Sequence, residues 1–111
     1  MTVKELIDSK VFDVINIGED TDRSIEKVFC CDLLSVAMGK APSGCAWVTV
    51  MGNMNTLAVA SLADAAAVIM AEGAVLDDTA RKKAVEQEIT VLKTELPVFD
   101  AALKVFQMLH V

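Results

Sequence analysis

The residues best suited to chemistry follow an apolar run in the stretch Val50–Leu62, VMGNMNTLAVASL. Gly52, Asn53 and Asn55 lie just before a nearly uncharged helical pattern. A strand, a tight turn and a helix start can hold an anion, because the first helical N–H groups are unpaired and carry partial positive charge. Glycine permits close backbone approach, and Asn tolerates left-handed geometry. The same residues also form ordinary turns and caps. Both interpretations remain open, and the single glycine favours the turn.

Ligands of open α/β sheets bind beyond the carboxyl ends of the strands, so neighbouring strand ends are expected to contribute. Glu72-Gly73 follows an apolar run that predicts one strand, and Lys93-Thr94-Glu95 follows another. Lys93 is the natural partner for an anion. The candidate ligand-binding residues are Gly52, Asn53, Asn55, Thr56, Lys93 and Arg23.

Arg23 has two open interpretations. It lies beside Asp22 and can bind a phosphate or carboxylate through two parallel hydrogen bonds. A surface ion pair is the commoner role of such an arginine and is favoured here. The acidic turn Glu19–Asp22 lacks the spacing and the glycine of a calcium loop, so no metal site is predicted.

Catalytic groups are sparse. Cys30, Cys31 and Cys45 have no metal-type spacing, and the single histidine is His110, next to the C-terminal residue. A catalytic thiol needs a base or a helix N-terminus beside it. Gly39-Lys40 lacks the upstream glycine of a phosphate-binding P-loop. We therefore expect no enzyme activity, no cofactor and reduced thiols, with at least one of Cys30 and Cys31 in the core because neighbours on a strand face opposite sides.

Composition narrows the class of protein further. The chain has 111 residues, of which 54% are hydrophobic, and predicts a single domain over residues 1–111. Its net charge is −6 and its basic residues form no run, which argues against binding to nucleic acid or to an anionic membrane surface. Neither a signal peptide nor a membrane-spanning segment is predicted, so we expect a cytoplasmic protein.

The first half of the chain predicts mixed elements. Thr2 and Glu5 form a capping box for a helix to about Ser9. The segments 12–17 and 26–31 are expected strands, and Asp32 is expected to cap a helix that stops at Gly39.

The second half alternates regularly between strands and helices. Strands are expected at 45–51, 66–70 and 89–92, and helices start near Asn55 or Thr56, at Asp77 and at Pro97. Short links between such elements imply right-handed crossovers and parallel strands. The predicted fold class is α/β, a three-layer α/β/α sandwich around a mostly parallel mixed sheet of about five strands.

The expected helix at Thr56–Ala65 is unusual because it is apolar nearly all round. Such a helix is buried on more than one side. Either another element covers it or its outer side meets a second copy of the chain. A homodimer is the favoured interpretation, because small residues permit close approach and twofold dimers are the commonest assembly.

Several segments together resemble the DRTGG domain family, which is similar to the N-terminal domain of HPr kinase/phosphorylase. They are DR at 22–23, CCDLLSVAMG at 30–39, GCAWVTVMGNMNTLAVASLADAAAVIMAEG at 44–73 and TVLKTELPVFDAA at 90–102. The name-giving motif keeps its Asp-Arg but neither glycine. The resemblance implies a stand-alone, often dimeric regulatory or ligand-sensing module without catalytic activity of its own.

The leading hypothesis is therefore a non-catalytic regulatory module that binds a nucleotide or other small anion and signals through a protein partner. The alternative is a purely structural interaction or dimerisation domain without a ligand. A small phosphotransferase-related enzyme is the least favoured interpretation, because no cluster of titratable residues is visible.

Overall fold

The computed structural model describes residues 1–110 and contains one five-stranded sheet with the strand order β1-β5-β4-β3-β2. β2, β3, β4 and β5 run parallel, and β1 pairs antiparallel with β5 at one edge. The bounds are β1 Asp13–Asn16, β2 Lys27–Cys30, β3 Cys45–Thr49, β4 Ala67–Met70 and β5 Val91–Lys93. The predicted mostly parallel mixed sheet is confirmed.

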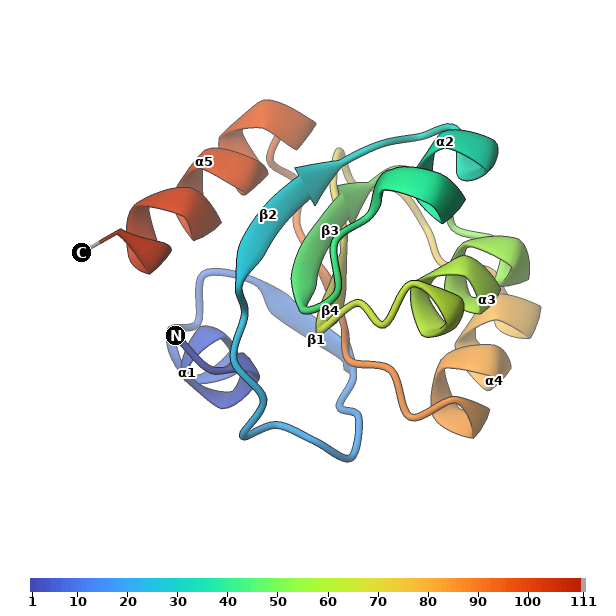
Figure 1. Ribbon diagram of the computed structural model, residues 1–111, viewed down its shortest axis with the longest axis horizontal. Coiled ribbons are helices and arrows are strands. Elements are labelled where there is room, and N and C mark those ends of the chain that lie inside the picture. The colour runs from blue at the N-terminus through green and yellow to red at the C-terminus, as the bar shows by residue number, and fades with distance from the viewer. Residues whose placement is uncertain (111) are drawn as a thin grey trace.

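Helices cover both faces of this sheet, so the predicted three-layer sandwich is confirmed as well (Figure 1). α2, α3 and α4 pack on one face, and α1 and α5 pack on the other. Their bounds are α1 Val3–Asp8, α2 Leu34–Lys40, α3 Met54–Leu62, α4 Asp78–Glu86 and α5 Val98–Leu109. No helix within residues 1–110 has the length and apolarity needed to cross a membrane.

The two central strands form the middle of the core. Every residue of β3 and of β4 is buried, because helices cover both of their faces. Trp47 of β3 is fully buried on the side of α2, α3 and α4, and its indole Nε1 donates a 2.9 Å hydrogen bond to the carbonyl oxygen of Cys31. The ring of Phe29, on the neighbouring strand, lies 6.4 Å away between centroids. Burial of the apolar ring and the hydrogen bond of its N–H group together hold the Trp47 side chain in one position.

Helix caps show where local sequence determines the structure. The capping box of Thr2 and Glu5 at α1 is confirmed, and so is the Asp77 cap of α4. The expected Asp32 cap is wrong, because Leu33 occupies the N-cap of α2 and makes no side-chain bond there. The Asp32 carboxylate instead accepts hydrogen bonds from Thr49 Oγ1 at 2.7 Å and Val50 N at 3.0 Å. Two long-range donors at the end of β3 thus replace the local ones.

The apolar character of α3 has an explanation within the fold. The helix lies in the middle of its layer, between α2 and α4, and its buried residues Leu57, Val59 and Ala60 belong to the core under that layer (Figure 1). Its exposed residues include Met54, Ser61 and Leu62. Neighbouring helices of the same chain therefore account for most of the pattern that had favoured a dimer.

Candidate functional site

The turn before α3 uses its hydrogen-bonding groups within the protein. Asn53 is the N-cap of α3, and its side-chain oxygen accepts from the backbone N–H of Asn55 at 3.0 Å and of Thr56 at 3.2 Å. The expectation that Asn55 or Thr56 caps the helix is wrong, because the chain reaches its extended cap conformation two residues earlier. Two of the N–H groups that would hold an anion already have a partner.

The other two candidate residues at this turn, Gly52 and Thr56, pack against the rest of the protein. The backbone of Gly52 lies against Val75, and its carbonyl oxygen accepts a 2.9 Å hydrogen bond from Asp77 N. Thr56 is fully buried, and its hydroxyl has no hydrogen-bond partner among residues 1–110. The start of α3 brings together four of the candidate residues, Gly52, Asn53, Asn55 and Thr56. They form a turn and a helix cap there.

Substitutions at the two asparagines are expected to differ. Asn53→Ala removes the cap and should lower the free energy of unfolding by about 1 kcal/mol. Asn55→Ala removes a side chain that makes no hydrogen bond within residues 1–110, and should change stability by less than about 0.5 kcal/mol. Urea unfolding of the two variants followed by circular dichroism measures the difference. Equal effects of the two substitutions would contradict the capping assignment.

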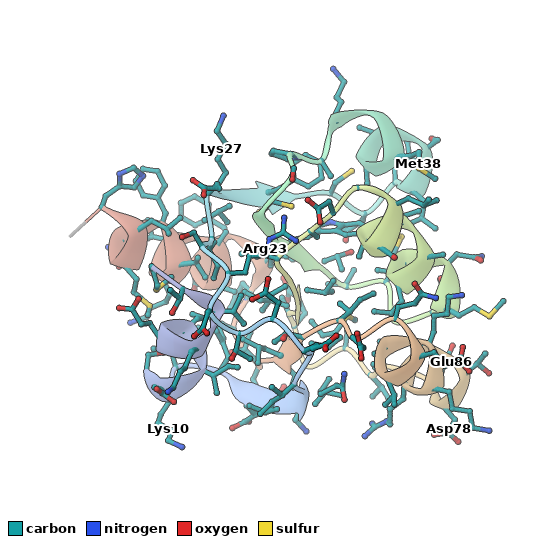
Figure 2. The ribbon with its side chains drawn as sticks, turned by 60° about the horizontal axis from the view of Figure 1, so that its bottom comes forward. Lys10, Arg23, Lys27, Met38, Asp78 and Glu86 are labelled. Atoms are coloured by element: carbon teal, nitrogen blue, oxygen red, sulfur yellow. The ribbon has the colours of Figure 1, made fainter. Side chains whose placement is uncertain are left out.

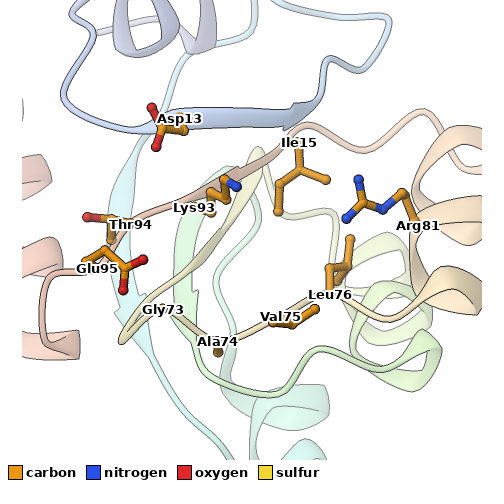
Figure 3. A pocket seen from close by; sticks show the side chains of 10 residues that line it. All are labelled: Asp13, Ile15, Gly73, Ala74, Val75, Leu76, Arg81, Lys93, Thr94 and Glu95. Carbon is orange, nitrogen blue, oxygen red and sulfur yellow. The ribbon is translucent and has the colours of Figure 1, made fainter.

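Lys93 lies apart from this turn and lines a cavity of about 270 Å³ beyond the carboxyl ends of β4 and β5. The segments Gly73–Leu76 and Lys93–Glu95 form two of its walls, β1 contributes Asp13 and Ile15, and α4 contributes Arg81. The strand ends at Gly73 and at Lys93–Glu95 line one cavity, but the Asn53 turn, which they were expected to complete, does not line it. Figure 3 shows Lys93 and Arg81 on either side of Ile15, with Leu76 next to Arg81.

The charges of this cavity are arranged unevenly. Among residues 1–110 the only ion pair within 4.0 Å joins Arg23 to Asp64, so neither Lys93 nor Arg81 is neutralised by a close carboxylate. Thr94 and Glu95 lie beyond Lys93, on the side away from Arg81 (Figure 3). The lining thus holds two cations without a close carboxylate partner among the described residues, and two carboxylates, Asp13 and Glu95, beyond Lys93. The arrangement can bind an anion.

Arg23 lies at the opposite end of the sheet, where Ser43 and Asp64 precede β3 and β4. Its two terminal nitrogens each bond one Asp64 carboxylate oxygen at 2.7 Å, and Ser43 Oγ donates to the same carboxylate at 2.6 Å. These bonds, chiefly those from Arg23, lower the pKa of the Asp64 carboxyl to about 2. In Figure 2 the Arg23 side chain lies over the middle of the molecule, whereas Lys10 and Lys27 extend outward from its edges. The favoured ion-pair interpretation agrees with this geometry, although the partner is Asp64 and not Asp22.

Arg23 also borders a second, smaller cavity of about 140 Å³ together with Asp20, Asp64, Gln87 and Glu88. The carboxylates there outnumber the single arginine, which is already paired. This hollow is therefore a poor place for an anion.

The three cysteine thiols differ in how deeply they are buried. Cys30 is exposed, Cys31 is half-buried against the core, and Cys45 is fully buried. Burial raises the pKa of Cys45 to about 11, and burial together with the charge of Asp32 raises that of Cys30. Both thiols are therefore protonated at neutral pH and are weak nucleophiles. The His110 ring packs against Phe106 at the end of α5, with 4.3 Å between the ring centroids and a tilt of 44° between the planes.

Arg81 is the site residue that the sequence did not single out. It is the fourth residue after the Asp77 cap, in the first turns of α4, on the side that borders the strand ends. The Asp77 cap fixes where α4 begins, and it is the one local signal that could have pointed to Arg81.

Comparison with known proteins supports the fold. No family model and no curated protein matches the sequence. A solved structure, the CBS and DRTGG domains of the regulatory region of Clostridium perfringens pyrophosphatase complexed with the activator diadenosine tetraphosphate, matches with a TM-score of 0.73 and 16% identity. The match covers 92% of this chain and 44% of that chain, so this chain spans less than half of the matched protein. The fold is DRTGG-like, and the matched protein is not an HPr kinase.

Proposed function

We propose that this chain is a non-catalytic regulatory module that binds a nucleotide or other small anion in the Lys93 cavity and signals through a protein partner. The observation that supports this proposal most directly is that Lys93, at the carboxyl end of β5, and Arg81 of α4 line one cavity and form no ion pair with a close carboxylate in the described part of the chain. Ligands of open α/β sheets bind at this edge. The proposed site is therefore at the neighbouring strand ends and not at the Asn53 turn, where two of the N–H groups already have a partner.

The matched pyrophosphatase structure lends this proposal support of a general kind. That protein's CBS and DRTGG domains form a regulatory region, and they were solved with a nucleotide activator. A shared fold does not by itself carry a shared function. The cavity of this chain, and not the likeness, is therefore the ground for proposing ligand binding.

The side chains around the cavity favour binding over catalysis. None of its lining residues is Cys, His or Ser, and the carboxylates Asp13 and Glu95 are not accompanied by a thiol or imidazole that could act with them as nucleophile or base. Burial keeps the Cys45 thiol protonated inside the core, and His110 lies at the far end of α5. An accessory domain that senses a ligand needs none of these groups.

Nucleotide binding is the first test. We expect AMP, ADP or ATP at millimolar concentration to raise the melting temperature measured by circular dichroism, because a ligand stabilises the folded state that binds it. Lys93→Gln should abolish the shift. Lys82→Gln, at an exposed lysine of α4 outside the cavity, should keep it. If neither nucleotides nor inorganic phosphate and pyrophosphate stabilise the unmodified chain, the proposal is wrong.

A dimerisation domain without a ligand is the second candidate, and α5 supplies its supporting observation. Phe99, Leu103 and Phe106 are 71%, 39% and 52% exposed and form one stripe along the helix. Asp100 and Lys104 lie along one border of the stripe, one turn apart. In an antiparallel pair of α5 helices, Asp100 of one copy would face Lys104 of the other. The occupant that fits this stripe is a second copy of the chain.

Sedimentation tests this candidate directly. We expect the chain to sediment as a dimer at micromolar concentration and Leu103→Glu to sediment as a monomer, because the substitution buries an unpaired charge in the interface. Val85→Glu places the same charge on an exposed apolar residue of α4 and should leave the dimer intact. A monomer at every concentration would exclude this candidate.

A further inference from the structure

The walls of the Lys93 cavity differ in chemistry from one end to the other, and this difference restricts the ligand. Arg81 and Lys93 flank Ile15 at one end, with Leu76 beside Arg81, and Asp13, Thr94 and Glu95 lie beyond Lys93 at the other end (Figure 3). A complementary ligand has an anionic group at one end and hydrogen-bond donors at the other.

The cationic end also has unused backbone donors. Gly73 N and Ala74 N donate to the carbonyl oxygens of Thr94 and Ala71, and Asp77 N donates to Gly52. Between them, the N–H groups of Val75 and Leu76 make no hydrogen bond to any group within residues 1–110. Leu76 is almost fully buried, and a buried N–H without an acceptor is costly. An acceptor supplied by a ligand would remove that cost.

These donors suit a phosphate better than a carboxylate. A guanidinium, an ammonium and two adjacent N–H groups offer more donors than the two oxygens of a carboxylate can accept. A phosphomonoester presents three terminal oxygens and close to two negative charges. Arginine binds such groups through two parallel hydrogen bonds.

At the other end of the cavity, the turn after β4 packs against the Glu95 side chain. Gly73 has a φ of +70°, and a Cβ at this position would overlap the Glu95 carboxylate. The Glu95 side chain therefore lies against bare backbone at the cavity wall. A carboxylate accepts hydrogen bonds but donates none when ionised, so it selects hydroxyl or amino groups on the ligand.

Size and lining composition argue against a nucleobase. The cavity volume of about 270 Å³ lies just below the range of roughly 300–1,000 Å³ usual for drug-sized ligands. None of its lining residues is aromatic, although stacking on aromatic rings is a common way to hold a base. The molecule that fits best is small, hydroxylated and without an aromatic ring, so a nucleotide should bind more weakly.

We infer that the ligand of this cavity is a phosphomonoester of a small polyol or sugar, with its phosphate between Lys93 and Arg81 and its hydroxyl groups toward Glu95. This inference rests on the proposed function and narrows its ligand class. Arg81 and Glu95 become binding residues that determine specificity, one for the phosphate and one for the hydroxyl groups.

Isothermal titration calorimetry of the full chain tests this assignment. The probes are ribose 5-phosphate, glucose 6-phosphate and glycerol 3-phosphate, with AMP, inorganic phosphate, ribose and gluconate for comparison. We expect at least one of the three phosphorylated probes to bind about tenfold more tightly than AMP and inorganic phosphate. Ribose and gluconate should not bind measurably, because they lack the phosphate.

Variants test which end of the cavity binds the phosphate and which end binds the hydroxyl groups. Arg81→Gln and Lys93→Gln should each weaken the phosphorylated probe about ten- to a hundredfold, the usual effect of losing a hydrogen bond to a charged group. Lys82→Gln on the same helix should leave the affinity unchanged. Glu95→Gln should weaken the phosphorylated probe but not inorganic phosphate, because only the former carries hydroxyl groups. A melting curve of each variant confirms that it is folded.

The outcomes separate this inference from the proposed function. If AMP binds as tightly as the phosphorylated sugars, or if Glu95→Gln has no effect on them, the ligand class is wrong while anion sensing stands. If no probe binds, including AMP and inorganic phosphate, both fail. Binding that survives Arg81→Gln and Lys93→Gln would place the ligand elsewhere and would overturn the site.

Discussion

Gly52→Ala is expected to lower the free energy of unfolding by about 3 kcal/mol or more, the upper end of the cost of forcing atoms into a packed interior. A Cβ at this position would overlap the carbonyl oxygen of Val75 and lie 2.9 Å from its carbonyl carbon. Both neighbours are backbone atoms, so no rotamer change can relieve the clash. The hydrogen bond from Asp77 N to the Gly52 carbonyl holds the two segments together at 2.9 Å. Separating them would disturb the start of α4.

Gly39→Ala is the matched control for this prediction. Gly39 lies inside α2, and no atom lies within 4 Å of where its Cβ would be. The same substitution there should stabilise the protein by roughly 0.5–1 kcal/mol, because alanine loses less backbone entropy in a helix. Urea unfolding followed by far-ultraviolet circular dichroism measures both variants. A Gly52→Ala protein as stable as the unmodified chain would show that the close packing against Val75 is wrong.

Trp47→Ala is expected to destabilise the protein by about 3–5 kcal/mol, the range for deleting a large buried aromatic side chain. The side chain is fully buried in the layer beneath α2 and α3 and contacts the Phe29 ring. Its removal leaves a cavity and also leaves the Cys31 carbonyl oxygen without its indole donor. Trp47→Phe should fall in between, because it fills part of the volume but restores no hydrogen bond.

Leu62→Ala controls for the loss of apolar side-chain atoms in general. Leu62 is 73% exposed at the end of α3, so its truncation should cost less than about 0.5 kcal/mol. Thermal and urea unfolding of all three variants give the comparison. If Trp47→Ala costs no more than Leu62→Ala, Trp47 does not lie in the core.

The layered fold was predictable because its strongest signals are local in the sequence. The apolar runs of β3 and β4 are continuous, as both faces of a central strand require. The capping box at Thr2 and Glu5 and the Asp77 cap are contained within four residues, so local sequence was sufficient. The antiparallel placement of β1 beside β5 needed the structure, because nothing local specifies which edge of a sheet a strand joins.

The candidate site was less predictable, because distant parts of the chain decide it. Asn53 and Asn55 are both good cap residues, and the cap lies at Asn53, directly after the point where Gly52 packs against Val75. Asp32 is a good local cap, but Thr49 and Val50 offer it better donors from another strand. Lys93 was identified from its position after a strand, whereas Arg81 requires the placement of α4 relative to β5. Tertiary contacts therefore resolved what capping propensities left open.

Trp47 is both the main intrinsic fluorophore of this protein and a fully buried residue. The chain has a single tryptophan and no tyrosine, so its intrinsic emission comes essentially from one indole within the core. That emission should shift to longer wavelength only when water reaches β3, which makes it a reporter of global unfolding. The Lys93 cavity has no aromatic residue in its lining, so its occupation should leave the spectrum unchanged. A change in emission on adding a ligand would therefore signal a rearrangement of the core, distinct from binding in the cavity.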